Sequence, residues 1–262
     1  MTVDPADPTW FPFDLDLAAG NARFLRLRAD VLDRSVFLDH RIALLERIPV
    51  DVPLADLAVP PTTPAWLFHT SFCCSTLLAR ALHATPWVEV LKEPFALRRL
   101  ADAMHAGQPT GDALPTVVAL LARPWHPGSR TVIKPTHAAL NLAPALLDAT
   151  PDSRAVVLHS SLRDFLVSNL KKPPETQDKV GRLAARLARD AGFDPELLRA
   201  AESDVGWPGL VAVQWTAAIA LAQRALRHAP SRVVALSDRE LLADVPGRVA
   251  AIADWLTLPA PP

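Results

Sequence analysis

Five side chains that could hold a phosphate group lie in one turn of the chain. The apolar run 66–69 is typical of a buried strand, and apolar residues recur at helical spacing from Leu77 onward. The turn between them carries Thr70, Ser71, Cys74, Ser75 and Thr76. A strand that enters a helix through such a turn directs backbone N–H groups and the positive end of the helix dipole at one point. The turn therefore predicts a phosphate site, although a plain helix start with a capping serine has the same pattern.

Two charged side chains stand where two further apolar runs end. Glu93 follows the run 88–91, and Lys134 closes the run 131–133. Glu93 is the candidate general base, since a carboxylate at a strand end can take the proton of an attacking group. It could also be a solvated residue that favours a helix N-terminus. Lys134 is the candidate source of positive charge for a transferred group. The alternatives are two bases and one cation, His137, His159 and Lys92.

The elements that must position these residues alternate along the chain. Short apolar runs expected to be strands are 66–69, 88–91, 131–134, 155–158 and 232–236, with helical patterns between them. This alternation predicts an α/β fold of three layers, with a mainly parallel sheet and helices on both faces. Ligands of such sheets bind at the carboxyl ends of the strands, which is where the polar residues gather.

The chain is expected to divide unevenly. Residues 1–64, which have helical periodicity over 21–45 and a proline-rich end, are predicted to be an N-terminal extension packed on the core. Residues 65–262 are predicted to form the α/β domain, with a helical insertion near 172–208. The extension and the insertion are the expected walls of an acceptor site, with Trp10, Phe11 and Trp207 as pocket or core residues.

Composition limits the class of protein. A net charge of −1 over 262 residues argues against a general nucleic-acid binder, and half of the residues are hydrophobic. Cys73 and Cys74 are adjacent, so they form no disulfide framework. Residues 1–20 lack the pattern of a signal peptide, and no apolar run is long enough to span a membrane. We expect a cytoplasmic protein; the oligomeric state does not follow from the sequence.

The turn and its helix resemble the 5′-phosphosulfate loop of the sulfotransferase family, whose fold is related to that of P-loop NTPases. In that loop a strand runs into a polar turn, then Ser-Thr, then a leucine-rich helix, and residues 75–82 read Ser-Thr-Leu-Leu-Ala-Arg-Ala-Leu. Cys74 stands where the family often has glycine, and the basic residue common earlier in the loop is missing. The turn is not a nucleotide-hydrolase P-loop, because no lysine precedes Ser75 and the turn has no glycine.

Four later segments are similar to the same family, in the family's order. They are Glu93-Pro94, the segment 155–168, Trp215 and the segment 234–242. Together with the loop they cover roughly residues 65–256. The family's late Arg-Lys-Gly loop is not visible in this chain.

The resemblance implies a reaction. The donor would be 3′-phosphoadenosine 5′-phosphosulfate, the base would be Glu93, and no metal is expected. Ser168 falls on the residue that contacts the 3′-phosphate, but the arginine of that segment falls on Ser160. Arg163 is the candidate replacement for the lost charge. The acceptor would be a small molecule or carbohydrate with a hydroxyl or amine.

Three other functions remain open from the sequence. A non-catalytic nucleotide-binding or scaffold protein would explain the missing arginine and glycine. A cysteine phosphatase would use Cys74 and Arg80, which have the spacing Cys-x₅-Arg after a strand. An ATP-dependent kinase is disfavoured by the absent P-loop lysine.

Overall fold

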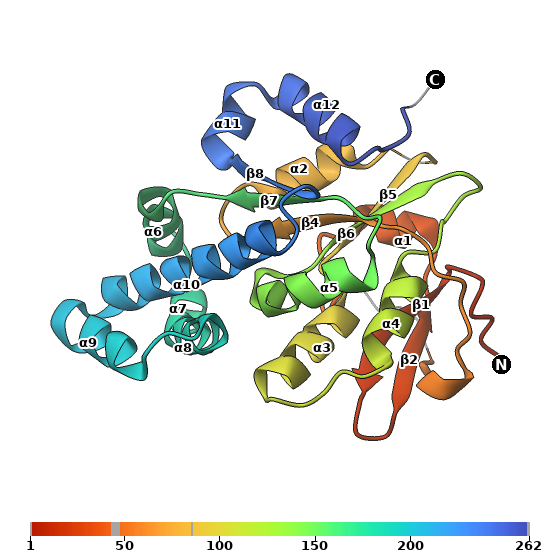
Figure 1. Ribbon diagram of the computed structural model, residues 1–262, viewed down its shortest axis with the longest axis horizontal. Helices are drawn as coiled ribbons and strands as arrows, with labels where there is room; N and C mark the ends of the chain where they lie inside the picture. The colour runs from red at the N-terminus through yellow and green to blue at the C-terminus, as the bar shows by residue number, and fades with distance from the viewer. Residues whose placement is uncertain (1, 43–47, 85, 261–262) are drawn as a thin grey trace.

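A five-stranded parallel sheet forms the centre of the computed structural model, which describes residues 2–42, 48–84 and 86–260 (Figure 1). The strand order is β5-β6-β4-β7-β8. The strands are β4 (Ala65–His69), β5 (Val88–Lys92), β6 (Arg130–Lys134), β7 (Ala155–His159) and β8 (Val233–Ser237). Each of the five predicted strands is present, and every pairing is parallel. The predicted α/β class is confirmed.

Both faces of the sheet are apolar because its strands are buried on both sides. Trp66 and Phe68 pack into one hydrophobic cluster, while Ala65 and Leu67 pack into the other. Helices on the first face are α3 (Phe95–His105), α4 (Ala113–Leu121), η2 (His137–Leu142), α5 (Ala143–Ala149) and α10 (Trp207–His228). Those on the second are α2 (Ser75–Leu82), α11 (Asp238–Ala243) and α12 (Val245–Trp255). Figure 1 shows the resulting three layers.

The topology places β4 at the point where the direction of the chain through the sheet reverses. The chain leaves β4 for β5 and β6 on one side, then crosses to β7 on the other side. Ligands of open parallel sheets bind outside the carboxyl ends of the strands at such a point. Residues 70–74, between β4 and α2, lie there.

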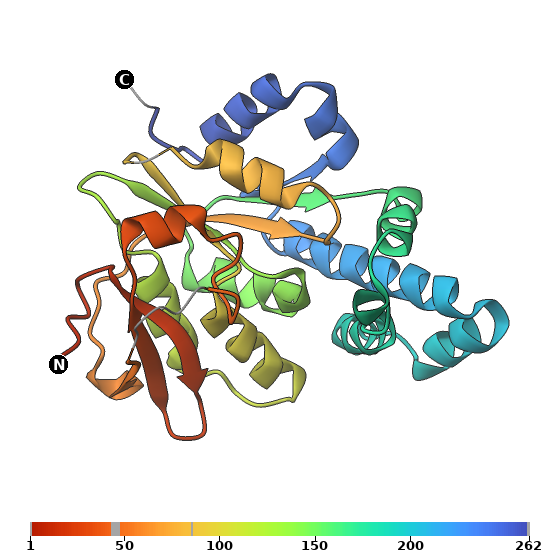
Figure 2. The same cartoon turned by 180° about the vertical axis from the view of Figure 1, so that it is seen from behind.

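The N-terminal region forms a small antiparallel sheet, visible in red in Figure 2. Its elements are β1 (Trp10–Asp16), β2 (Asn21–Arg26), β3 (Val50–Pro53), α1 (Ala29–Arg34) and η1 (Leu54–Asp56). The helical pattern predicted over 21–45 is therefore wrong at 21–26, and within residues 27–42 only Ala29–Arg34 is helical; residues 43–45 lie outside the described residues. Pairing of β2 with both neighbours overrides local helical spacing there. Trp10 and Phe11 are core residues that share a cluster with α3 and α4.

Three helices lie in the segment predicted as an insertion: α7 (Pro174–Gln177), α8 (Val180–Ala191) and α9 (Pro195–Val205). The helix that follows them, α10, packs against α8 and α9. Trp207 packs against the core, and its Nε1 donates to the carbonyl of Gln177 at 3.3 Å. Of the helices the structure describes, α10 alone has the length and hydropathy of a membrane span, although the sequence predicted none. More than half of that stretch is buried, as expected for a core helix.

Candidate active site at the carboxyl edge of the sheet

The turn after β4 is built from left-handed residues without any glycine. Ser71, Phe72 and Cys74 have φ angles of 73°, 46° and 61°. Cys74 is the N-cap of α2, and it has the left-handed backbone conformation that glycine adopts most readily. Each such residue costs on the order of 1–3 kcal/mol, and such strain is found mostly at functional sites.

The turn presents donors that have no internal partner. Within the part of the chain that the structure describes, the main-chain N–H groups of Phe72, Cys73, Cys74 and Thr76 make no hydrogen bond. Successive N–H groups in a turn with left-handed residues form a concave anion site, and the N-terminus of α2 adds its dipole. The turn can therefore cradle an oxyanion.

A cavity of about 570 Å³ opens onto this turn. Among its lining residues from the turn and from α2 are Ser71, Cys74, Ser75 and Thr76. From the ends of β5 and β6 come Glu93, Thr136 and His137, and from other segments come Arg41, Arg98, Lys172 and Lys179. The structure thus brings most of the predicted loop residues and Glu93 into one cavity.

Glu93 and Lys134 form a buried ion pair at the edge of this cavity. Lys134 Nζ donates to Glu93 Oε1 at 2.7 Å, and the two side chains are 1% and 11% exposed. The main chain repeats the link, since the Glu93 N–H donates to the Lys134 carbonyl at 2.7 Å. Glu93 is also left-handed, with a φ of 57°. The pair is therefore held at both backbone and side chain, with the carboxylate facing the cavity.

His69 is a site residue that the sequence analysis missed. Its Nδ1 accepts the N–H of Ser71 at 3.2 Å, while its Nε2 lies 3.7 Å from Glu93 Oε1. Burial, and secondly the charge of Lys134, holds the pKa of His69 well below its usual value, so the ring is neutral at pH 7. Because Nδ1 accepts, the ring proton sits on Nε2, toward Glu93. His69 is hydrogen-bonded to the turn through Nδ1, while its buried Nε2 lies near Glu93 without a hydrogen-bond partner among the described residues.

His137 gives the site a measurable dependence on pH. Burial lowers its pKa to about 4, against 6.5 for the free group. The unfolded chain therefore binds more protons between these values, and the free energy of unfolding falls as pH drops through that window. From pH 7.5 to 5.0 the loss from His137 is about 2 kcal/mol. We expect His137→Asn to flatten the pH dependence in urea unfolding; equal slopes in variant and wild type would contradict this.

The remaining predicted residues lie outside the lining of this cavity. Thr70 is fully buried, with no hydrogen-bond partner for its hydroxyl among the described residues. Ser168 is on α6 (Leu162–Leu170), one turn from Phe165, which packs on Phe72 with ring centroids 5.4 Å apart. Arg163, on the same helix, is exposed.

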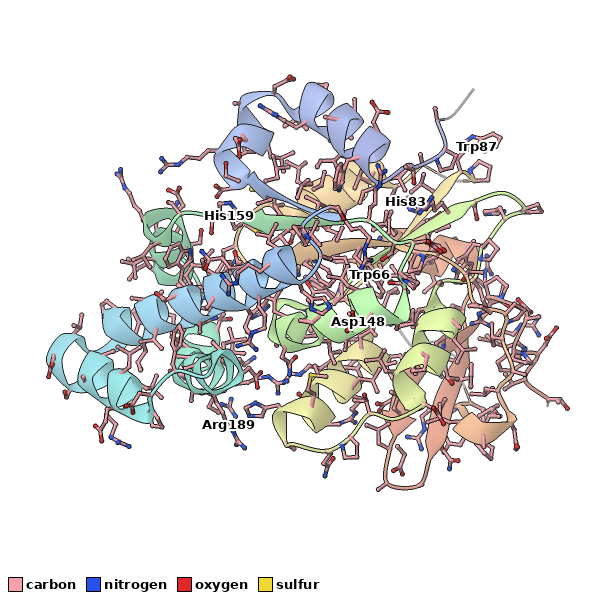
Figure 3. All side chains as sticks on the ribbon, viewed as in Figure 1. Trp66, His83, Trp87, Asp148, His159 and Arg189 are labelled. Carbon is pink, nitrogen blue, oxygen red and sulfur yellow. The ribbon has the colours of Figure 1, made fainter. Side chains whose placement is uncertain are left out.

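The two alternative groups at other strand ends have other surroundings. Lys92 Nζ donates to the carbonyls of Leu32 and Asp33 at 3.3 and 3.1 Å, so it ties α1 to the sheet. His159 is the last residue of β7 and lies beside Ser237, the last residue of β8, at the carboxyl edge of the sheet (Figure 3). Neither residue lines the cavity.

The cysteines do not suit nucleophilic chemistry. Burial raises the pKa of the Cys74 thiol, and it raises that of Cys73 to about 11. A phosphatase needs a thiolate and a loop that wraps its arginine around phosphate. Here residues 75–82 are helical and Arg80 is exposed on the outer side of α2. The phosphatase alternative does not fit this geometry.

Comparison with known proteins finds similarity at the level of solved structures. No protein-family model matches the chain, and no curated protein matches it. The chain is similar to a sulfotransferase from Alicyclobacillus acidocaldarius, with a TM-score of 0.45 and 16% identity over 76% of this chain and 82% of that one.

Proposed function

We propose that this protein transfers a sulfuryl group from 3′-phosphoadenosine 5′-phosphosulfate to a hydroxyl or amine of a small molecule or carbohydrate. One observation carries the proposal. A turn with unpartnered N–H groups and the carboxylate of Glu93 line the same cavity at the carboxyl edge of the sheet, and the ammonium of Lys134 is paired with that carboxylate behind the cavity wall. Sulfuryl transfer needs a cradle for the leaving phosphate, a base for the acceptor and positive charge near the transferred group. All three occur together here.

The step balances with groups of this chain. Glu93 takes the proton of the acceptor hydroxyl or amine as its oxygen or nitrogen attacks sulfur. The bond between sulfur and the bridging phosphate oxygen breaks, and 3′-phosphoadenosine 5′-phosphate leaves. The N–H groups of residues 72, 73, 74 and 76 hold the phosphate as it gains charge, with the hydroxyls of Ser75 and Thr76 beside them. Lys134 compensates the charge of Glu93 before the proton arrives.

The 3′-phosphate would lie toward α6. Phe72 has Phe165 on one side and the ammonium of Lys172 at 5.2 Å from its ring centroid. Ser168 is one helical turn from Phe165. We assign Ser168 and Lys172 to this phosphate, with Arg163 as a further cation from the same helix. The two free cysteines are in keeping with a reducing cytoplasm.

A binding protein without catalysis is the second proposal, and Ser160 favours it. This residue stands where the resembled family has its arginine, and it is fully buried, while the indole of Trp215 donates to its carbonyl at 2.9 Å. Ser160 supplies no positive charge at that point. A scaffold of this kind would bind the nucleotide and would show no transfer with any acceptor.

Thermal unfolding with 3′-phosphoadenosine 5′-phosphate, ATP and AMP tests donor binding. A ligand at one hundred times its Kd stabilises the folded state by about 2.7 kcal/mol, which raises the Tm by roughly 5–10 °C. We expect this shift with the 3′-phosphate compound, and its loss in Ser75→Ala/Thr76→Ala. Ser203→Ala, on exposed α9, is the matched control and retains the shift. A well-folded protein with no shift would exclude the proposed donor.

A further inference from the structure

A second cavity of about 510 Å³ adjoins the first and is lined mostly by basic side chains, four of them Lys or Arg. The two cavities share Arg98, His137 and Lys179. Beyond these, the second cavity is lined by His105, Arg182 and Arg186 and by the apolar Ala138 and Leu183, and no carboxylate of the described residues lines it. The chain as a whole carries a net charge of −1, so this concentration of positive charge is local.

One face of α8 supplies most of this charge. Lys179, at the N-cap, is followed by Arg182 and Arg186 at helical spacing, so all three lie on the same side. Among the described residues, Lys179 and Arg182 form no ion pair. Two exposed cations turned to one cavity repel each other and favour an anion between them.

The guanidinium of Arg186 has hydrogen-bond donors that no acceptor among the described residues of the cavity wall satisfies. Its Nη1 pairs with Asp102 at 2.5 Å, and its Nε lies 3.9 Å from Asp190. Its Nε and Nη2 are buried and have no hydrogen-bond partner in the described chain. Buried donors without partners cost about 1–3 kcal/mol each, more when they are charged. Asp102 is shared with Arg98, whose Nε donates to it at 2.7 Å.

We propose that this cavity binds an oxyanion of the acceptor, so that the natural acceptor carries a carboxylate, sulfate or phosphate besides its reacting hydroxyl or amine. The inference rests on the proposed function. The reacting group lies at Glu93, and the anion lies past His137 against α8. Arg98 and Lys179, which line both cavities, contact the molecule along its length.

The binding test separates this site from the phosphate turn. With 3′-phosphoadenosine 5′-phosphate saturating the turn, inorganic pyrophosphate is titrated and the Tm is followed. We expect pyrophosphate to raise the Tm of the wild type, with an apparent Kd weakened about tenfold or more in Lys179→Gln/Arg182→Gln. Arg189→Gln is the control, because Arg189 is exposed on the same helix and does not line the cavity (Figure 3).

The kinetic test compares acceptors that differ in one charge. Sulfuryl transfer is measured with 4-hydroxyphenylacetate and its neutral amide. We expect a higher kcat/KM for the acid, reduced about tenfold in Lys179→Gln/Arg182→Gln, and a smaller reduction for the amide, because Lys179 also lines the first cavity. If neither compound is turned over, the pyrophosphate titration decides.

The outcomes distinguish the two proposals. Equal pyrophosphate binding in all three proteins overturns the anion site and leaves donor binding intact. Weaker nucleotide binding in Lys179→Gln/Arg182→Gln means that the cavity holds a donor phosphate, which overturns its assignment to the acceptor. Absence of nucleotide binding in the wild type overturns the proposed function, and the difference in pyrophosphate binding between the wild type and Lys179→Gln/Arg182→Gln then tests the cation site.

Discussion

Replacing Glu93 with glutamine is expected to slow sulfuryl transfer by a factor of about 10²–10⁴, the usual contribution of a general base. The amide keeps the size of the side chain and can still accept from Lys134 Nζ, which is 2.7 Å from Oε1 in the wild type. It cannot take a proton from the acceptor. Initial rates at saturating donor measure the loss, and nucleotide binding by thermal shift should remain.

The control for this variant is Glu175→Gln, an exposed glutamate on α7 that does not line the cavity. It should retain the wild-type rate. A rate that survives in Glu93→Gln would mean that another group takes the proton, and His137, which also lines the cavity, is the next candidate. His137→Asn in the Glu93→Gln background would then remove the remaining activity.

Lys134→Met is expected to cost about 3–5 kcal/mol of stability, because it leaves a carboxylate without its partner at a buried position. Lys134 is 1% exposed, and its ammonium also lies 5.7 Å from the Phe37 ring centroid. Urea unfolding at pH 7.5 measures the change as a lower midpoint with an unchanged slope. Lys171→Met, on the exposed end of α6, is the matched control and should shift the midpoint little.

The double variant Glu93→Gln/Lys134→Met tests whether this cost comes from the stranded charge. Removing both charges should recover part of the loss, with a coupling energy of about 1–3 kcal/mol in a double-mutant cycle. Strictly additive losses would show that the two side chains do not stabilise each other, whatever their distance.

The sheet could be predicted from sequence because its strands are buried on both faces and therefore read as continuous apolar runs. Ala65–His69 and Ala155–His159 are examples, with Gly- and Pro-containing or polar segments around them. Asn21–Arg26 could not be predicted in the same way. It is a strand because β1 and β3 pair with it, and β3 lies more than twenty residues further along the chain. Local spacing does not contain that information.

In the candidate site, too, local sequence predicts some features, while others depend on contacts between distant segments. Glu93 and Lys134 were each predicted from their place at strand ends, but their ion pair depends on the register of β5 and β6, where Lys92 faces Lys134. His69 was missed because it ends an apolar run, where a histidine is most simply a core residue. Lys179, on a charged segment far along the chain, reaches the cavity only through the packing of α8. Its exposed position gave no signal.

A turn without glycine also loses fewer backbone conformations when it binds a ligand. Residues 70–76 carry side chains at every position, although three of them are left-handed. Side chains narrow the range of backbone conformations. The conformational entropy of the turn is therefore lost when the chain folds and not when the ligand binds. Glycine at position 74 would relieve the backbone strain there. It would also let the turn sample more backbone conformations when no ligand is bound. Greater stability of the folded chain would then be accompanied by slower, looser capture of phosphate.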